Sequence, residues 1–290
     1  MNILLGWLIA LAASITGFLA LGGSWEQLWV PEEFLVIFGA ALGTLIAGNK
    51  WRHLRKTLRV FSRSFSSNSF NREVNLQLLC LLFELLQAAK RGGMKSIEAD
   101  IEKPAESALF QRYPRVLRYR RLMEFITDYF RMMGDNSVTL VQLEGVLNQE
   151  IETLYAESRQ PSHSIMTLAD SMPAFGIVAA IIGVIKALSA VATSSPAQIG
   201  ALIAAALVGT LVGVFAAYAI LGPVAKSLEQ IADEELKPFE AVKEILLAYY
   251  SHFSPSVCVE YGRKVLYSDS RPSMQELEDG VRNSVRQVSP

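Results

Sequence analysis

The sequence has little charge. Only 19% of its 290 residues are charged, against about 25% in an ordinary soluble domain, while 51% are hydrophobic. The formal net charge is −1, so neither a nucleic acid nor another polyanion is favoured as a partner. The shortage of charge and the excess of apolar residues together indicate a membrane protein.

The residue types of enzyme and metal chemistry are also scarce. The three histidines are scattered, and the two cysteines, Cys80 and Cys258, match no metal-ligand spacing. The sequence contains no G-x-S-x-G, no H-E-x-x-H and no phosphate-binding glycine loop. We therefore expect no enzyme activity, no metal site and no cofactor, and we interpret both cysteines as buried, reduced thiols.

Long apolar runs take the place of these motifs. The run at 3–21, ILLGWLIALAASITGFLAL, follows no basic segment, so we interpret it as a retained membrane span rather than a secretory signal. A second span is uncharged from Phe34 to Asn49, with Pro31 to Glu33 expected at the membrane interface. The uncharged stretch from Ala187 to Ala225 contains the turn sequence TSSPAQ at 193–198, which divides it. This division predicts a third span near 171–191 and a fourth near 199–222.

The runs predict an all-α membrane protein with four transmembrane helices in two hairpins and a large helical cytoplasmic domain between the second and third. The predicted parts are helices 1 and 2 (1–50), the cytoplasmic domain (51–169), helices 3 and 4 (170–225) and a cytoplasmic C-terminal helical segment (226–290). Basic residues without acids follow the second span, whereas the loop at 22–33 carries only acids, so both termini are expected in the cytoplasm. We expect a linker at 64–70 and helices at 74–90, 121–133, 141–154 and 226–250.

Small residues recur at helical spacing in three of the spans. They allow helix backbones to approach closely, either within the chain or between subunits. The repeats are Gly39, Gly43 and Ala47 in span two, Gly176 with Ala180 and Ala179, Gly183 and Ala187 in span three, and Ala201, Ala205, Gly209, Gly213 and Ala217 in span four.

Few polar residues lie within the spans. Thr44 and Thr210 could each bond the carbonyl four residues earlier, which is the ordinary role of a lone threonine in a helix. Asp170 could cap the start of span three. Pro173 and Pro223 are expected at the same depth, as a hinge or as ordinary helix ends. No Asp or Glu lies within the predicted spans, so any ion path would need a carboxylate from another chain.

Four segments carry a family resemblance. They are GGSWEQLWVPEEFLVIFGAALGTLIAGN, DSMPAFGIVAAIIGVIKALS, GALIAAALVGTLVGVFAAYAILGPVA and VEYGRKVLYSDSRPSMQELE, and their order and spacing resemble the MotA family of flagellar motor stator proteins, lateral-flagellar members included. The resemblance implies an ion-conducting stator subunit in the bacterial inner membrane. It also implies a pentamer around two copies of MotB, whose single span carries the aspartate, and torque on the rotor protein FliG.

The resemblance also implies roles for single residues. Pro173 and Pro223 match two functionally important prolines of the family, and Thr210 matches a hydroxyl beside the aspartate of MotB. Ala180 stands where sodium-driven members have threonine, and because a methyl group cannot bind sodium, we expect protons to be the coupling ion. For Asp170, a helix cap and a proton exit both remain open.

Two further matches concern the rotor. Lys90 and Glu98 fall where the family has an arginine and a glutamate that meet FliG, with Arg91 next to the lysine. Lysine keeps the charge but not the planar fork of arginine, so the register of this contact is open, and a solvated helix face is the alternative. The alternatives for the whole chain are an energising subunit of the ExbB or TolQ type, a sodium-driven stator, and a membrane scaffold that conducts nothing.

Overall fold

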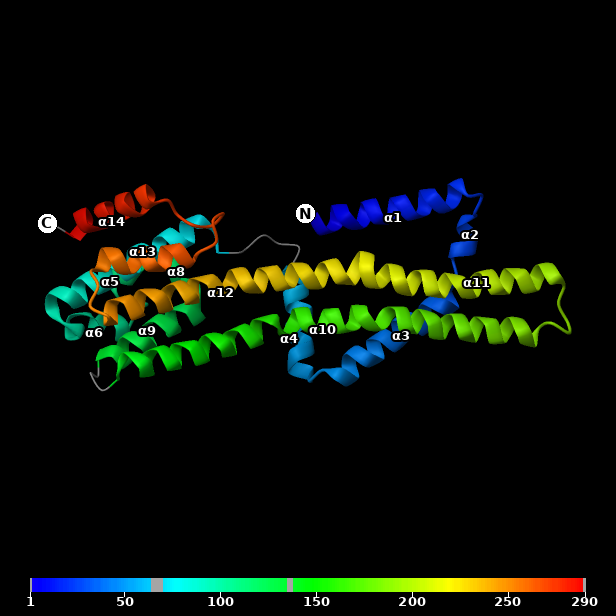
Figure 1. Cartoon of the computed structure of the whole chain (residues 1–290), viewed down its shortest axis with the longest axis horizontal. Helices are drawn as coiled ribbons and strands as arrows, with labels where there is room; N and C mark the ends of the chain where they lie inside the picture. Colours follow the sequence, from blue (N-terminus) through cyan, green and yellow to red (C-terminus); the bar gives the residue numbers. More distant parts are fainter. Residues whose placement is uncertain (1, 64–69, 135–137, 289–290) are drawn as a thin grey trace. The chain divides into compact units, whose positions relative to one another are not determined.

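The computed structural model describes residues 2–63, 70–134 and 138–288, which form helices without a strand among them (Figure 1). The predicted helical fold class is therefore confirmed for the described part of the chain. Two compact units result: a membrane unit of residues 1–67 and 158–231, and a polar unit of residues 68–157 and 232–290. The linker expected at 64–70 lies, apart from Phe70, outside the described residues.

The membrane unit contains the four predicted spans. Its helices are α1 (Asn2–Ala20), α2 (Trp25–Leu28), α3 (Pro31–Gly48), α4 (Trp51–Arg63), α11 (Pro196–Phe215), the π-helix η2 (Ala216–Leu221) and parts of α10 (Leu140–Ser189) and α12 (Gly222–Tyr250). By length and hydropathy, α1, the α2–α3 segment, α10 and the segment from α11 to α12 could each cross a membrane.

The first part of the fold that sequence reasoning misplaced is the start of the third span. We expected a helix end near Asp170 and Pro173, whereas α10 runs unbroken for 50 residues and holds Pro161 and Pro173 in its interior. Asp170 is thus inside a helix and caps nothing, so the cap interpretation is wrong. Hydroxyl groups near Pro161 join α10 to its neighbours: Ser162 Oγ donates to the Ala225 carbonyl (2.7 Å) and Ser164 Oγ to Asn49 Oδ1 (2.9 Å).

The turn between α10 and α11 is where the sequence predicted it. Ser195 is the N-cap of α11, Pro196 follows at the first helical position, and Gln198 completes a capping box. The Ser195 amide donates to Gln198 Oε1 (2.9 Å), which satisfies one of the backbone donors that a helix start leaves open. Figure 1 shows α10 and α11 returning side by side from this turn.

The polar unit is built around α5 (Arg72–Gly92). Asn71 caps this helix by accepting from the Val74 amide (3.0 Å), and Gly93, with φ 76°, lets the chain turn away at its end. The remaining helices are η1 (Met94–Ile97, 3₁₀), α6 (Glu98–Glu102), α7 (Ala108–Gln111), α8 (Pro114–Leu117), α9 (Arg120–Gly134), α13 (Pro255–Val265) and α14 (Met274–Val288). All four helices predicted in and beyond the polar block are present within α5, α9, α10 and α12.

Apolar residues of α5, α9, α12 and α13 form one continuous core in the polar unit. Cys80 and Cys258 are buried in it as free cysteines, as predicted. Burial raises the pKa of the Cys80 thiol to about 12 and that of Cys258 to about 11, because a thiolate is poorly solvated there. Both groups are therefore neutral, unreactive thiols at physiological pH.

An ion pair inside the polar unit explains part of the motif VEYGRKVLYSDSRP. The side chain of Arg263, only 9% exposed, donates to both carboxylate oxygens of Glu260 (2.6 and 2.7 Å) and to the Pro272 carbonyl (3.0 Å). The hydrogen bond from Arg263 holds the pKa of Glu260 below its usual range. One planar side chain thus joins α13 to the loop before α14.

Replacing this arginine is expected to destabilise the polar unit. Arg263→Lys keeps the charge but cannot make all three bonds, so we expect a loss of about 1–3 kcal/mol in unfolding free energy, measured on the purified full chain. Because the folded pKa of Glu260 is lowered, its contribution is present above the unfolded pKa of about 4.3 and disappears as the pH falls through the folded value.

The matched control is Arg120→Lys. Arg120 pairs with Glu124 across one helical turn (2.7 Å), and its side chain is 90% exposed. Such a pair contributes little, so this variant should unfold at the wild-type midpoint. Equal midpoints for both variants would show that the Arg263 fork does not support the unit.

Candidate ion path and rotor-contact site

The centre of the membrane unit is a contact of α10 and α11 that runs backbone to backbone. A Cβ atom added at Gly176 would lie 2.8 Å from the Gly209 carbonyl oxygen, and one added at Gly213 would lie 2.7 Å from the Met172 carbonyl oxygen. Real Cβ atoms do not approach backbone this closely, so glycine is required at both positions. The small-residue repeats of spans three and four therefore serve packing within the chain, at least in part.

This contact fixes the register of the two helices and corrects the expected depth of the prolines. Met172 lies beside Gly213, while Ser162 lies beside Ala225. Pro173 is consequently level with the Gly213 region, and Pro223 is level with residues near Ser164. At 1.5 Å per residue the prolines are roughly 13 Å apart along α10, and the prediction of a common depth is wrong.

The register places Thr210 between Pro173 and Ala180 in depth. A Cβ atom added at Gly176 would lie 3.2 Å from the Cα of Thr210, and Gly176 lies between Pro173 and Ala180 on α10. Both are half-buried, whereas Asp170 is exposed one turn before the half-buried Pro173 and Pro223 is exposed on α12. The structure thus places Thr210 within about one helical turn of both Pro173 and Ala180, and leaves Pro223 and Asp170 farther from it.

Thr210 differs from Thr44 in its hydrogen bonding. Thr44 Oγ1 donates to the Ala40 carbonyl (3.0 Å), which is the ordinary bond of a helical threonine. Among the described residues, the Thr210 hydroxyl makes no such bond to its own chain. Its donor and acceptor are therefore available to a group outside the chain.

The helix before Pro223 has an unusual backbone. Residues 216–221 form the π-helix η2, and the wider turn precedes a residue that has no N–H to donate. The indole Nε1 of Trp7 on α1 donates to the Ile220 carbonyl oxygen within this segment (3.2 Å). A π-helix next to a proline is a local weakness in an otherwise continuous helix, and it was not visible in the sequence pattern.

Glu33 is the polar residue that sequence reasoning missed. We expected it at the membrane interface, but its side chain is only 7% exposed, and its Oε2 has no hydrogen-bond partner among the described residues. The carboxylate lies against Gly183 of α10 and Gly209 of α11. The only signal in the sequence was an acid at the start of an apolar run, which commonly marks an interface.

The third small-residue repeat faces away from its own chain. A Cβ atom at Gly39 or Gly43 would meet nothing within 4 Å in the described structure, and both residues are exposed. Bulky apolar side chains beside them are exposed as well, among them Phe38 and Leu42. This face of α3 has no use in the packing of the chain itself.

The predicted rotor-contact residues lie together at one end of α5. Lys90 and Arg91 occupy its last turn, the chain turns at Gly93, and Glu98 opens α6. All three side chains are exposed. Opposite charges are thus presented by neighbouring elements of the polar unit.

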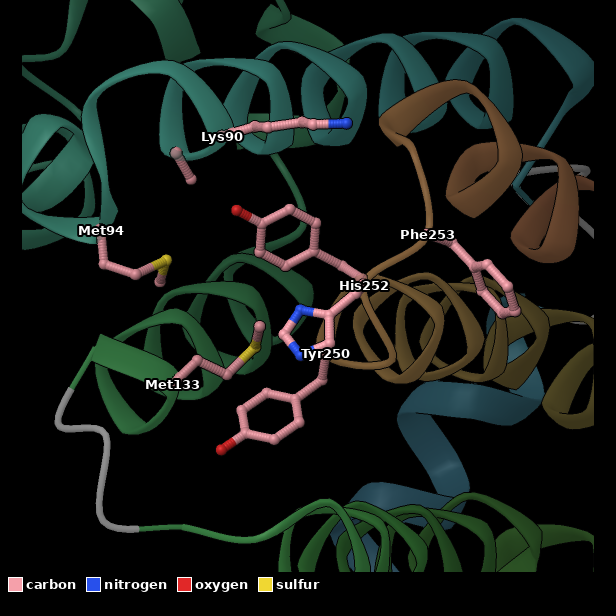
Figure 2. A pocket seen from close by; sticks show the side chains of 8 residues that line it. Lys90, Met94, Met133, Tyr250, His252 and Phe253 are labelled. Carbon is pink, nitrogen blue, oxygen red and sulfur yellow. The ribbon is translucent and has the colours of Figure 1, made fainter.

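Lys90 also borders a cavity of about 550 Å³ in the polar unit (Figure 2). Figure 2 shows the sulfur ends of Met94 and Met133 and the ring of His252 facing this space, with Lys90 at its edge on α5. His252 has φ 65° and ends the turn after α12. Both polar and apolar side chains thus line the space that Lys90 borders.

These features define a multi-pass helical membrane protein of the proton-channel class. Residues 119–241 match the MotA/TolQ/ExbB proton channel family, and residues 4–93 match the Motility protein A N-terminal family. The second match covers the first two spans, which distinguishes the chain from a TolQ or ExbB subunit.

The chain belongs to the MotA family of motility proteins and is a protein of the bacterial inner membrane. It is 40% identical to Motility protein A of Escherichia coli (strain K12), covering 97% of this chain and 95% of the relative. It is also 36% identical to Chemotaxis protein LafT of Vibrio parahaemolyticus, covering 94% of this chain and 96% of that protein.

Two solved structures share the fold. The MotAB structure of C. jejuni matches with a TM-score of 0.73 at 19% identity, covering 94% of this chain and 98% of the other. The flagellar MotAB stator complex of Bacillus subtilis matches with a TM-score of 0.70 at 23% identity, covering 93% and 98%.

The glycine contact leads to a direct test by substitution. Gly213→Ala forces a methyl group against the Met172 carbonyl and should destabilise the membrane unit by about 1–3 kcal/mol, measured as thermal unfolding of the full chain in detergent. Gly200→Ala on the same helix has open space and should leave the midpoint unchanged or higher, since alanine favours helix. A Gly213→Ala protein as stable as Gly200→Ala would contradict the packing described.

Proposed function

We propose that this MotA-family stator subunit conducts protons with a MotB-type partner and converts the proton flow into torque on the rotor protein FliG. The observation that carries the proposal is the Thr210 hydroxyl, which has no hydrogen-bond partner among the described residues and lies beside the α10–α11 glycine contact. Neither α11 nor α10 beyond Asp170 carries an acid, so the carboxylate that meets Thr210 is assigned to the partner. The role assigned to the chain is transport and coupling rather than catalysis.

The proposed assembly is a ring of five chains around two partner helices, with both termini in the cytoplasm. The exposed Gly39–Gly43 face of α3 supports it, because such a face lets another helix approach closely. α1 supports it as well, since its apolar window is not buried within the chain. The basic residues of α4, which include Arg52, Arg55 and Arg59, support the cytoplasmic orientation.

In this proposal the path residues have distinct roles. Thr210 binds the hydrated proton or the partner carboxylate through its hydroxyl group. Ala180, about one helical turn away along α10, offers no oxygen ligand, which favours protons over sodium. Pro173 and Pro223 with its π-helix are two separate flexible points along the helix pair, and the exposed Asp170 receives protons that leave the path.

The rotor contact is assigned to Lys90, Arg91 and Glu98. These exposed charges, of both signs, lie at the end of α5 and the start of α6. A rotor surface with the complementary pattern would be steered to this end of the polar unit. The cavity beside Lys90, which both polar and apolar side chains line, could accommodate a side chain of the rotor protein next to the charged contact.

The ion path is tested by removing one hydroxyl group. In a host that lacks its own stator and produces the cognate partner, Thr210→Ala should reduce motor speed roughly tenfold, as expected from the loss of about 1–1.5 kcal/mol of hydrogen bonding in the path. Thr44→Ala, which removes only a bond to its own helix, should leave the speed unchanged.

Pro173→Leu should also slow the motor, because it removes a flexible point of α10. Thr210→Ala and Pro173→Leu proteins that both support full motility would exclude α10 and α11 as the conducting wall. Speed is measured on tethered cells at matched expression.

The rotor contact is tested by charge reversal. Lys90→Glu should impair torque at high load several-fold without changing the amount of stator in the membrane, because it repels an acidic rotor residue. Reversing that residue on FliG should restore torque. Lys103→Glu is the control. Lys103 is exposed and forms an ion pair with the exposed Glu106, so its reversal should change the torque little. Wild-type torque with Lys90→Glu would place the contact elsewhere.

A further inference from the structure

Glu33 is a buried carboxylate with an unmet hydrogen-bonding need. It belongs to the first turn of α3, and the residue as a whole is only 7% exposed. Its Oε2 accepts no hydrogen bond from any described residue. An ionised carboxylate in such surroundings is costly by several kcal/mol, so it must acquire a proton, a cation or a donor from outside the chain.

The surrounding helices leave room for this carboxylate. A Cβ atom at Gly183 would lie 2.8 Å from Glu33 Oε1, and one at Gly209 would collide with Oε2. Alanine at either position would displace the acid. The small-residue repeats thus have two roles. Gly176 and Gly213 allow the helix contact, and Gly183 and Gly209 leave space for the Glu33 carboxylate.

The position of this acid relates it to the proposed path. Gly209 immediately precedes Thr210, and Gly183 follows Ala180 by three residues in the direction of the turn at 190–195. Glu33 therefore lies near the level of Ala180, beyond Thr210 on the side of that turn. With the proposed orientation, this is the outer side of the path.

Few charges act on Glu33. Lys186, one turn after Gly183 on α10, attracts it, and Glu32, its exposed neighbour on α3, repels it. α11 has no charged residue, and α2, which contacts α11, carries the exposed Glu26.

We propose that Glu33 is a second proton-binding carboxylate of the path, supplied by this chain on the outer side of Thr210. The ionised carboxylate takes a proton from water at the outer side and becomes a neutral acid. It then releases the proton to water at the Thr210 level, which carries it to the partner's carboxylate, and is ionised again. This inference rests on the proposed function.

Three variants test the inference in the assembled complex. Glu33→Gln keeps shape and polarity but cannot exchange a proton, so motor speed should fall at least about tenfold at every external pH. Glu33→Asp retains a titratable group and should support rotation with a shifted dependence of speed on external pH. Glu32→Gln, an exposed acid on the same turn, should change speed less than about twofold.

The variants also separate a proton-binding role from a purely structural one. Glu33→Gln should assemble with its partner and unfold at or above the wild-type midpoint, because the buried charge is gone. Wild-type speed and pH profile in Glu33→Gln would overturn the inference. If Glu33→Gln does not assemble, Glu33→Asp decides: an unchanged pH profile overturns the inference, and a shifted one supports it.

Two further results distinguish this inference from the proposed function. A motor that runs normally with Glu33→Gln but stops with Thr210→Ala overturns the role of Glu33 alone, whereas normal rotation in both overturns the conducting path as well. Motor speed that follows sodium concentration at fixed pH and membrane potential would contradict proton binding at Glu33 and identify sodium as its ligand.

Discussion

The backbone contact between α10 and α11 is the constraint on which the rest of the membrane unit depends. Within a bilayer, apolar side chains gain little by leaving lipid for protein, so helices associate through close packing and hydrogen bonds. Because Gly176 and Gly213 have no side chains, the backbones of the two helices come into direct contact at these positions. The contact fixes the helix register, and the register determines which residues share a level with Thr210 and which, such as Pro223, do not.

Close packing also explains how polar groups are retained in apolar surroundings. Glu33 occupies space that Gly183 and Gly209 leave free, and the backbone of Thr210 lies against Gly176. Where the backbone is irregular, side chains of other segments bond its carbonyl groups. In the π-helix before Pro223, the Ile220 carbonyl accepts a hydrogen bond from the Trp7 indole. Beside Pro161, the Ser162 hydroxyl donates to the Ala225 carbonyl and so connects α10 to α12. The polar groups Glu33 and Thr210 thus lie at the same glycines through which α10 and α11 pack.

Much of the fold could be predicted because its signals are local. Apolar runs of sufficient length predicted the four spans, TSSPAQ predicted the turn that Ser195 and Gln198 cap, and amphipathic patterns predicted α5, α9 and the long α12. The end of a span was harder to predict. Asp170 and Pro173 have the chemistry of a helix start, yet α10 continues through them, because neighbouring helices hold it in place and one missing N–H does not end a helix.

The sequence by itself determined that this is a four-span helical membrane protein, that its spans carry close-packing glycines, and that the interiors of its predicted spans lack an acid. These properties depend on composition and on the periodicity of one chain segment at a time. Only the tertiary structure decided which glycines meet, that the two prolines lie at different levels, and that Glu33 is buried against α10 and α11. These depend on the register between segments far apart in the sequence, and register is set by packing geometry that no single segment contains.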